Sequence, residues 1–282
     1  MAGLATQPVS HVFATTLTTA SFAYLVGGIP PSVAVLLVVM FGILSAAQNS
    51  VNAWTDIIAD RMSWPKRPLA MGAVPLRQAT GFSILLLLAG ISLLVWILTI
   101  RSSPLVLLIM TLDIFLRVAY STPPLRLKRY PLLSNLIIAS FAVSFPFAAT
   151  VALSDRPNIL VLPVAAILLF EAIATLVLED FVTMEGDQTI GDVTLPLALG
   201  RAKAALISAG LFVGALVTAL YSFAAQKSVL WLLVAAIILL QTRAALRLRF
   251  TTSRELRTYH LAGILVFLTG IILVLGYATG FV

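Results

Sequence analysis

Long apolar segments constrain the fold of this chain more than any other feature. Nine of them occur, at about residues 11–29, 31–50, 79–100, 104–121, 132–153, 159–179, 202–223, 228–247 and 259–281. A helix needs roughly 20 apolar residues to cross the hydrocarbon core of a bilayer. The sequence therefore predicts an all-α polytopic membrane protein with nine transmembrane helices, in a single domain over residues 1–282.

Composition agrees with this fold class and argues against several kinds of site. The 282 residues are 60% hydrophobic and only 10% charged, far from the usage of soluble domains. Cysteine is absent, and the two histidines, His11 and His260, lie far apart in the sequence. We therefore expect no disulfide, no thiolate site and no zinc or haem centre. Residues 1–10 carry no basic segment of the kind that begins a cleavable signal peptide.

The basic residues alternate between the connections. Those after the second, fourth, sixth and eighth segments hold most of the 18 Lys and Arg residues, whereas the opposite connections hold Arg101, Arg156 and Lys227. The positive-inside rule then places the N-terminus and the basic connections in the cytoplasm and the C-terminus outside the cell membrane. This arrangement explains the net charge of +7 without a nucleic-acid partner.

The first acidic motif follows the second apolar segment. Asn52, Asp56 and Asp60 are spaced at i, i+4 and i+8, so an uninterrupted helix would stack them along one face. Their oxygen atoms are the ligands that hard cations prefer, and Mg²⁺ commonly binds one or two carboxylates together with substrate phosphates. Helix capping explains a single such residue equally well, but it does not explain two clusters.

The second acidic motif follows the sixth segment, in the sequence EDFVTMEGD. Asp180 and Asp187 are seven residues apart and fall near one helical face, with Glu185 beside them, although Gly186 makes a helix end plausible. Carboxylates are costly near a bilayer, so two such clusters in one apolar chain indicate an ion or substrate site.

Basic residues accompany the acidic motifs and favour a phosphate-bearing substrate. Lys66 and Arg67 follow the first motif, and Arg126 and Lys128 lie in YSTPPLRLKR. Guanidinium groups match phosphate geometry, and Lys adds a mobile charge. The positive-inside pattern alone also accounts for these residues. Their predicted role in substrate binding is therefore weaker than that of the two acidic motifs. Together the motifs indicate an enzyme that holds a diphosphate through divalent metal at a membrane surface.

Three segments resemble the UbiA superfamily of intramembrane prenyltransferases: NAWTDIIADRMSWPKRPLAMGAV at 52–74, YSTPPLRLK at 120–128 and DFVTMEGDQTIGDVTLPLALG. The resemblance implies helices around a central cavity, an active site at the cytoplasmic face, a polyprenyl diphosphate donor and Mg²⁺. It implies that Asn52, Asp56, Asp60, Asp180 and Asp187 bind metal and diphosphate.

From motifs and resemblance together we predict two sets of site residues. The predicted catalytic residues are Asp56, Asp60, Asp180, Asp187 and Tyr120. The predicted substrate-binding residues are Asn52, Lys66, Arg67, Arg117, Arg126 and Lys128. Tyr120 could instead be an interface tyrosine, and Arg117 could instead pair with Asp113 one turn earlier on the same helix. Glu171 either hydrogen-bonds another helix or contacts an acceptor.

The acceptor stays open among several classes. The short spacing from Asp60 to Arg67 resembles the ether-lipid and chlorophyll-synthase branches, whereas Thr183 and Glu179 depart from patterns seen in parts of the family. We favour geranylgeranylglyceryl phosphate, a lipid acceptor, over an aromatic quinone precursor. From another class, a secondary transporter of an anionic metabolite is the alternative, although its site would lie nearer the bilayer midplane.

Overall fold

The computed structural model describes residues 6–249 and 255–279, and within them the regular structure is helical throughout. The longer helices are α1 (Thr6–Val26), α2 (Pro31–Thr55), α4 (Leu76–Ile100), α5 (Pro104–Ser121), α8 (Leu162–Thr189), α10 (Arg201–Gln226), α11 (Leu230–Arg247) and α12 (Glu255–Ala278). The shorter ones are α3 (Ile57–Ser63), α6 (Leu133–Ala139), α7 (Phe145–Leu153) and α9 (Leu195–Leu199). A π-helical segment, Ser140–Ser144, joins α6 to α7. Arg254 and the end of the predicted segment 259–281 lie outside the described residues.

Eight spans in the described part of the chain are long and apolar enough to cross a membrane. They are α2, α4, α5, the continuous stretch Leu133–Leu153, α8, α10, α11 and α12. The chain is therefore an integral membrane protein with an all-helical fold. The first predicted segment is also helical, as α1, but it is not among the eight, so a count of nine spans stays a prediction.

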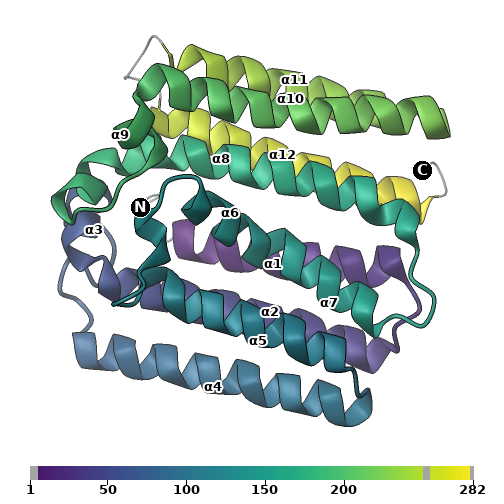
Figure 1. Ribbon diagram of the computed structural model, residues 1–282, viewed down its shortest axis with the longest axis horizontal. Helices are drawn as coiled ribbons and strands as arrows, with labels where there is room; N and C mark the ends of the chain where they lie inside the picture. The colour runs from purple at the N-terminus through teal and green to yellow at the C-terminus, as the bar shows by residue number, and fades with distance from the viewer. Residues whose placement is uncertain (1–5, 250–254, 280–282) are drawn as a thin grey trace. The chain divides into compact units, whose positions relative to one another are not determined.

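The chain forms two compact units, and it passes between them several times. The first unit comprises residues 1–129, 140–158 and 185–192, and the second comprises residues 130–139, 159–184 and 193–282. In the first unit, α2 packs against α1, α4 and α5, and α7 packs against α1 and α5 (Figure 1). Its core includes Leu37, Met40, Phe41 and Met110, which are fully buried.

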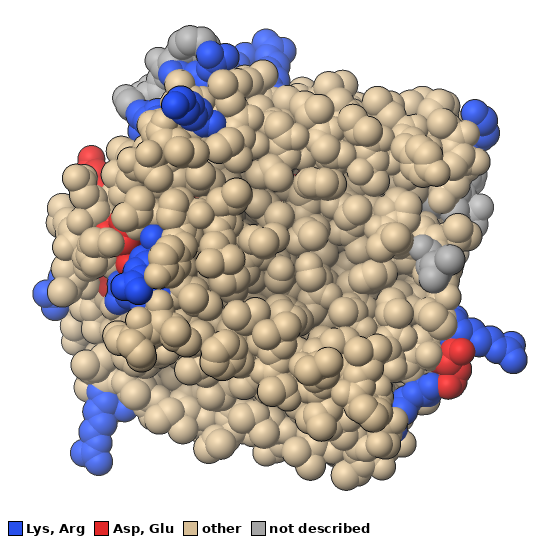
Figure 2. Space-filling model, viewed as in Figure 1, with Lys and Arg blue, Asp and Glu red and all other residues tan. Residues whose placement is uncertain are grey.

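In the second unit, α11 packs against both α10 and α12 (Figure 1). Trp231 is fully buried in α11, and its indole N–H donates to the Gln226 side chain at 2.7 Å. The predicted link between Glu171 and another helix is confirmed, because Thr269 of α12 donates to the Glu171 carboxylate at 3.2 Å. On the face that Figure 2 shows, uncharged side chains cover the middle, and the Lys, Arg, Asp and Glu residues lie toward the edges of the view.

Candidate active site

The helix that carries the first acidic motif is broken at Asp56. α2 ends at Thr55, and Asp56 has φ −111° and ψ 16° before α3 begins. The Thr55 hydroxyl donates to the backbone carbonyls of Val51, at 3.0 Å, and Asn52, at 3.1 Å. Such bonds from a side chain to the backbone bend helices. The prediction that Asn52, Asp56 and Asp60 lie along one face of an uninterrupted helix is therefore wrong. The four-residue spacing survives, because the backbone N–H of Asp60 still donates to the Asp56 carbonyl at 2.8 Å.

Two carboxylates and two cations meet beside this break and form what we call the four-charge cluster: Asp56, Arg126, Lys128 and Asp192. Arg126 donates to both carboxylate oxygens of Asp192, from Nε at 2.9 Å and from Nη2 at 3.1 Å. Lys128 hydrogen-bonds Asp56 and lies 3.1 Å from an Asp192 oxygen. Arg126 also lies 3.5 Å from Asp56. Each cation therefore contacts both carboxylates.

The four-charge cluster is only partly shielded from solvent. Asp192 and Lys128 are nearly buried, with side-chain exposures of 5% and 8%, whereas Asp56 and Arg126 keep 17% and 21%. The hydrogen bonds to Asp192 raise the pKa of Arg126, against the opposing effect of its burial. Phosphate oxygens accept the same charge-assisted hydrogen bonds as carboxylates. The two cations can therefore exchange carboxylate partners for a diphosphate.

The third residue of the first motif has its own cation. Arg67 Nη1 donates to both carboxylate oxygens of Asp60, at 2.6 and 2.7 Å, and its guanidinium lies 5.7 Å from the Trp64 ring. Burial raises the pKa of Asp60, and the charge and hydrogen bond of Arg67 oppose that rise. Lys66, predicted to bind substrate, is exposed and forms no ion pair with Asp60 or with the four-charge cluster.

The second acidic motif lies within a continuous helix. α8 runs through Gly186 to Thr189, so the predicted helix end at Gly186 is wrong. A Cβ atom at Gly186 would lie 2.6 Å from the Ala59 carbonyl oxygen and 2.3 Å from the Ser63 hydroxyl. Glycine here lets the end of α8 pack directly on α3. This contact brings the segment from Asp187 to Asp192 to the first motif, within the first unit.

Asp180 lies seven residues before Asp187 on α8 and belongs to the second unit. Its carboxylate accepts from the side-chain amide of Asn135 at 3.3 Å and from the backbone N–H of Leu195 at 3.4 Å. These donors orient the Asp180 carboxylate at the start of the last two turns of α8.

A further ionic pair lies inside α5. The predicted pair of Asp113 and Arg117 is confirmed: both are buried, and Arg117 Nε donates to Asp113 at 2.7 Å. Arg117 also donates to the carbonyl of Phe141, at 3.3 Å, in the π-helical segment, and its guanidinium lies 4.4 Å from the Phe141 ring. The ring of Tyr120 meets the same Phe141 edge to face, with centroids 6.4 Å apart.

Ser121 connects α5 to the first motif. Its hydroxyl hydrogen-bonds the Asn52 side-chain oxygen, which also accepts from Gln48 at 3.0 Å. The side-chain oxygen of Asn52 is thereby held in place beside the break at Asp56.

Comparison with known proteins identifies the family and the fold. Residues 12–271 match the UbiA prenyltransferase family, which is nearly the whole chain. The chain belongs to the UbiA prenyltransferase family. Among its relatives, a digeranylgeranylglyceryl phosphate synthase of Thermococcus kodakarensis is 31% identical over 72% of this chain and 69% of that protein. A chlorophyll synthase of Avena sativa is 29% identical, over 59% of this chain and 45% of its own length.

Solved structures show the same fold at lower sequence identity. A UbiA homologue from Aeropyrum pernix superimposes with a TM-score of 0.70 at 19% identity, covering 95% of this chain and 99% of the other. A homologue from Archaeoglobus fulgidus, bound to DMAPP and Mg²⁺, gives 0.64 at 17% identity, covering 93% and 96%. These likenesses establish the fold of this UbiA family member.

Two residues that contact predicted site residues of this UbiA family member were not themselves predicted. Asp192 completes the four-charge cluster, and its signal was the repeat of Gly-Asp at 186–187 and 191–192. Asn135, which bonds Asp180, stands in an apolar run that carries no signal of its own.

Proposed function

We propose that this prenyltransferase transfers a polyprenyl group from its diphosphate to geranylgeranylglyceryl phosphate, forming an ether lipid. The four-charge cluster carries the proposal. It holds two cations in place with carboxylates that a diphosphate can displace, beside a motif rich in metal-binding oxygens. Such an arrangement suits a polyanion that arrives with its own metal.

The oxygen donors of the site fit Mg²⁺. Among the described residues, no group of three or more His, Cys, Asp or Glu side chains already forms a metal site. Asp56 and Asp192 share two cations, however, so a diphosphate that takes up Lys128 and Arg126 would free carboxylate oxygens for a hard cation. Asn52, Asp56, Asp60 and Asp187, all of the first unit, are the proposed ligands. The predicted ligand role of Asp180, in the second unit, rests on its motif alone. When bound, Mg²⁺ would neutralise charge on the leaving diphosphate.

Protein side chains supply the remaining steps. Lys128 and Arg126 stabilise the charge that builds on the diphosphate as the allylic carbon–oxygen bond breaks. Arg67, which pairs with Asp60, would add a further cation beside the diphosphate if Asp60 held the metal. The ring of Tyr120, held against Phe141, offers its face to the allylic cation, an attraction that aromatic rings provide. The oxygen of the acceptor hydroxyl then bonds to the allylic carbon as the diphosphate leaves, and the hydroxyl proton is taken up by the released diphosphate or by water.

The choice of acceptor rests on the relatives. Two proteins named digeranylgeranylglyceryl phosphate synthase, from Thermococcus kodakarensis and Methanoregula boonei, match this chain at 31% and 29% identity over 208 residues each. A probable homogentisate phytyltransferase of Oryza sativa is also 31% identical, but over 180 residues and 46% of its length. An aromatic acceptor is therefore the second candidate.

We also propose a single prenyltransferase domain in the cell membrane, with the N-terminus and the site in the cytoplasm and the C-terminus outside. The alternation of basic residues between connections supports this orientation. Cysteine labelling from either side of sealed vesicles would test it, because the chain has no native cysteine.

The deciding experiment measures product formation by purified protein in detergent. Radiolabelled geranylgeranyl diphosphate is offered with geranylgeranylglyceryl phosphate, homogentisate or chlorophyllide, with Mg²⁺ or with EDTA. Asp56→Asn and Asp180→Asn are assayed beside the wild type, and Asp155→Asn is the control, because Asp155 is an exposed partner of Arg101 elsewhere in the first unit.

We expect a product only with Mg²⁺, only from the lipid acceptor, and in neither site variant. A product formed only from homogentisate or only from chlorophyllide would show that the proposed acceptor is wrong and that the enzyme is still a prenyltransferase. Folded protein that binds no diphosphate would refute the prenyltransferase assignment, and diphosphate or metabolite uptake into liposomes would then favour the transporter.

A further inference from the structure

The basic residues on the outer face of α11 have no acidic residues near them in the sequence. From Val193 to Arg254 the chain contains no Asp or Glu. Arg243 and Arg247 fall one turn apart in the last turns of α11, and both are exposed. Neither takes part in an ion pair with the described residues. No described residue therefore neutralises their positive charge.

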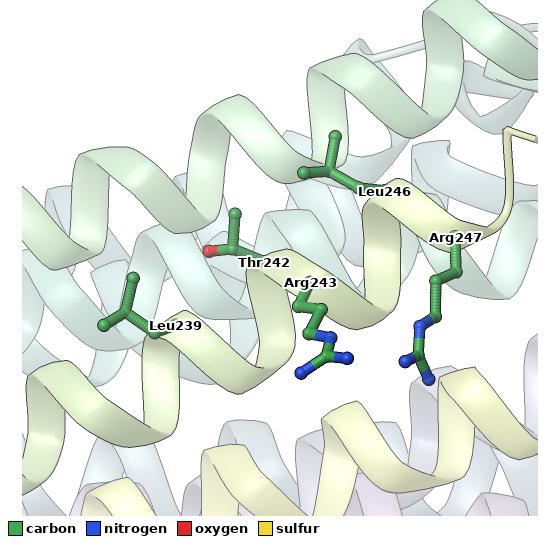
Figure 3. A pocket seen from close by; sticks show the side chains of 5 residues that line it. All are labelled: Leu239, Thr242, Arg243, Leu246 and Arg247. Atoms are coloured by element: carbon green, nitrogen blue, oxygen red, sulfur yellow. The ribbon is translucent and has the colours of Figure 1, made fainter.

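A groove accompanies these arginines. It has a volume of about 480 Å³ and is lined by Leu239, Thr242, Arg243, Leu246 and Arg247. Both guanidinium groups extend from the same side of α11, with the leucines along the same stretch of helix (Figure 3). Exposed Leu239 lies one turn further into the apolar part of α11 than Arg243. Leu239 thus lines the groove toward the middle of α11, and Arg247 lines it at the end of the helix.

The position of the groove along α11 matches the structure of a lipid. α11 has 18 residues, about 27 Å at the rise of an α-helix, close to the thickness of the hydrocarbon core. Its last turn therefore lies at the depth of the headgroups, where phosphates are, and Leu239 lies at the depth of the acyl chains. The carbonyl groups at this helix end repel anions, so the two arginines are what makes the end attractive to a phosphate.

We propose that this groove binds an anionic phospholipid. The phosphate lies on the guanidinium groups of Arg243 and Arg247, and the first part of an acyl chain lies along Leu239. A soluble phosphate would gain nothing from the exposed leucines, and an acidic protein segment would gain little from a groove that opens to the acyl region. Each basic side chain near an anionic membrane surface contributes about fivefold in affinity, so the two together give about 30-fold.

The test compares lipid retention by the full-length protein in native mass spectrometry, together with its thermal unfolding temperature. The probes are phosphatidylglycerol and chain-matched phosphatidylcholine. The variant is Arg243→Ala with Arg247→Ala, and a second variant replaces both by Lys. The control is Arg77→Ala with Arg156→Ala, because it also removes two exposed cations, from the first unit.

We expect wild type and control to retain phosphatidylglycerol over phosphatidylcholine and to unfold at a higher temperature with it. The alanine variant should bind phosphatidylglycerol about 30-fold more weakly, and the lysine variant should keep most of the affinity. Equal retention by the alanine variant would overturn the proposal. It would also be overturned if inorganic phosphate alone raised the unfolding temperature as much as the lipid, or if the alanine variant raised KM for the acceptor with lipid retention unchanged.

Discussion

Two of the ionic groups in the first unit differ in environment and in consequence. The four-charge cluster lies where helices end and loops meet, with each cation shared between two carboxylates and with part of Asp56 and Arg126 open to solvent. The pair of Asp113 and Arg117 lies within a transmembrane helix, is buried, and leaves one Asp113 oxygen without a partner in the described part of the chain.

This difference separates exchangeable charges from fixed ones. A shared, partly hydrated cation can change partners at small cost, because water and the remaining partner compensate it. A buried pair that loses one member leaves an uncompensated charge in a low-dielectric interior. We therefore interpret the four-charge cluster as substrate-binding and the Asp113–Arg117 pair as the support that positions Phe141 and Tyr120.

The largest expected effect comes from breaking the fixed pair. Arg117→Ala should lower the free energy of unfolding by about 3–5 kcal/mol, because it leaves the Asp113 carboxylate buried and unpaired. Asp113→Leu combined with Arg117→Met should restore most of that loss, because neither buried charge remains. Thermal and denaturant unfolding in detergent would measure both. A single variant as stable as wild type would show that the pair is not fixed.

Removing a cation from the exchangeable cluster should affect ligand binding more than folding. Lys128→Ala should weaken diphosphate binding about 10- to 100-fold, the value of a hydrogen bond to a charged group, while Arg126 still pairs with both carboxylates. Titration calorimetry with geranylgeranyl diphosphate would measure it. Lys66→Ala is the matched comparison, since Lys66 is exposed; an equal loss there would mean that long-range charge alone governs affinity.

The contact that brings the end of α8 to α3 can be tested at Gly186. Gly186→Ala should cost about 1–3 kcal/mol in unfolding free energy, the usual range for an overpacked contact, and should reduce activity. Ser63→Ala should not rescue it, because the Ala59 carbonyl still lies 2.6 Å from the new Cβ. Gly210→Ala, in α10 with nothing within 4 Å of its Cβ position, should be neutral or slightly stabilising.

The smallest expected effect is a gain in diphosphate affinity rather than a loss. Asp192 competes with diphosphate for Arg126 and Lys128, so Asp192→Asn should tighten the binding of diphosphate without metal by roughly tenfold. Binding measured in EDTA would detect this gain, and Asp155→Asn should show none. Weaker binding by Asp192→Asn under these conditions would mean that Asp192 positions the cations rather than competing for them.

Much of the site could be predicted from the sequence because its residues come in short motifs. The first acidic motif, Arg126 and Lys128 do lie together, and the pairing of Asp113 with Arg117 follows from their spacing on one helix. The break at Asp56 was not predictable in this way. The four-residue spacing fits a straight helix as well as a broken one. The structure adds the hydrogen bond from the Thr55 hydroxyl to the Asn52 carbonyl, which accompanies the break.

The sequence by itself determined the membrane class, the position of the helices and the family, because apolar length and motif spacing are local properties of the chain. Only the tertiary structure decided which carboxylate shares which cation. Asp192 meets Arg126 across 66 positions of sequence, and Gly186 owes its role to the backbone of α3. Such contacts depend on how closely two helices can approach each other. That distance is set by side chains of both helices, so the sequence of one segment does not predict it.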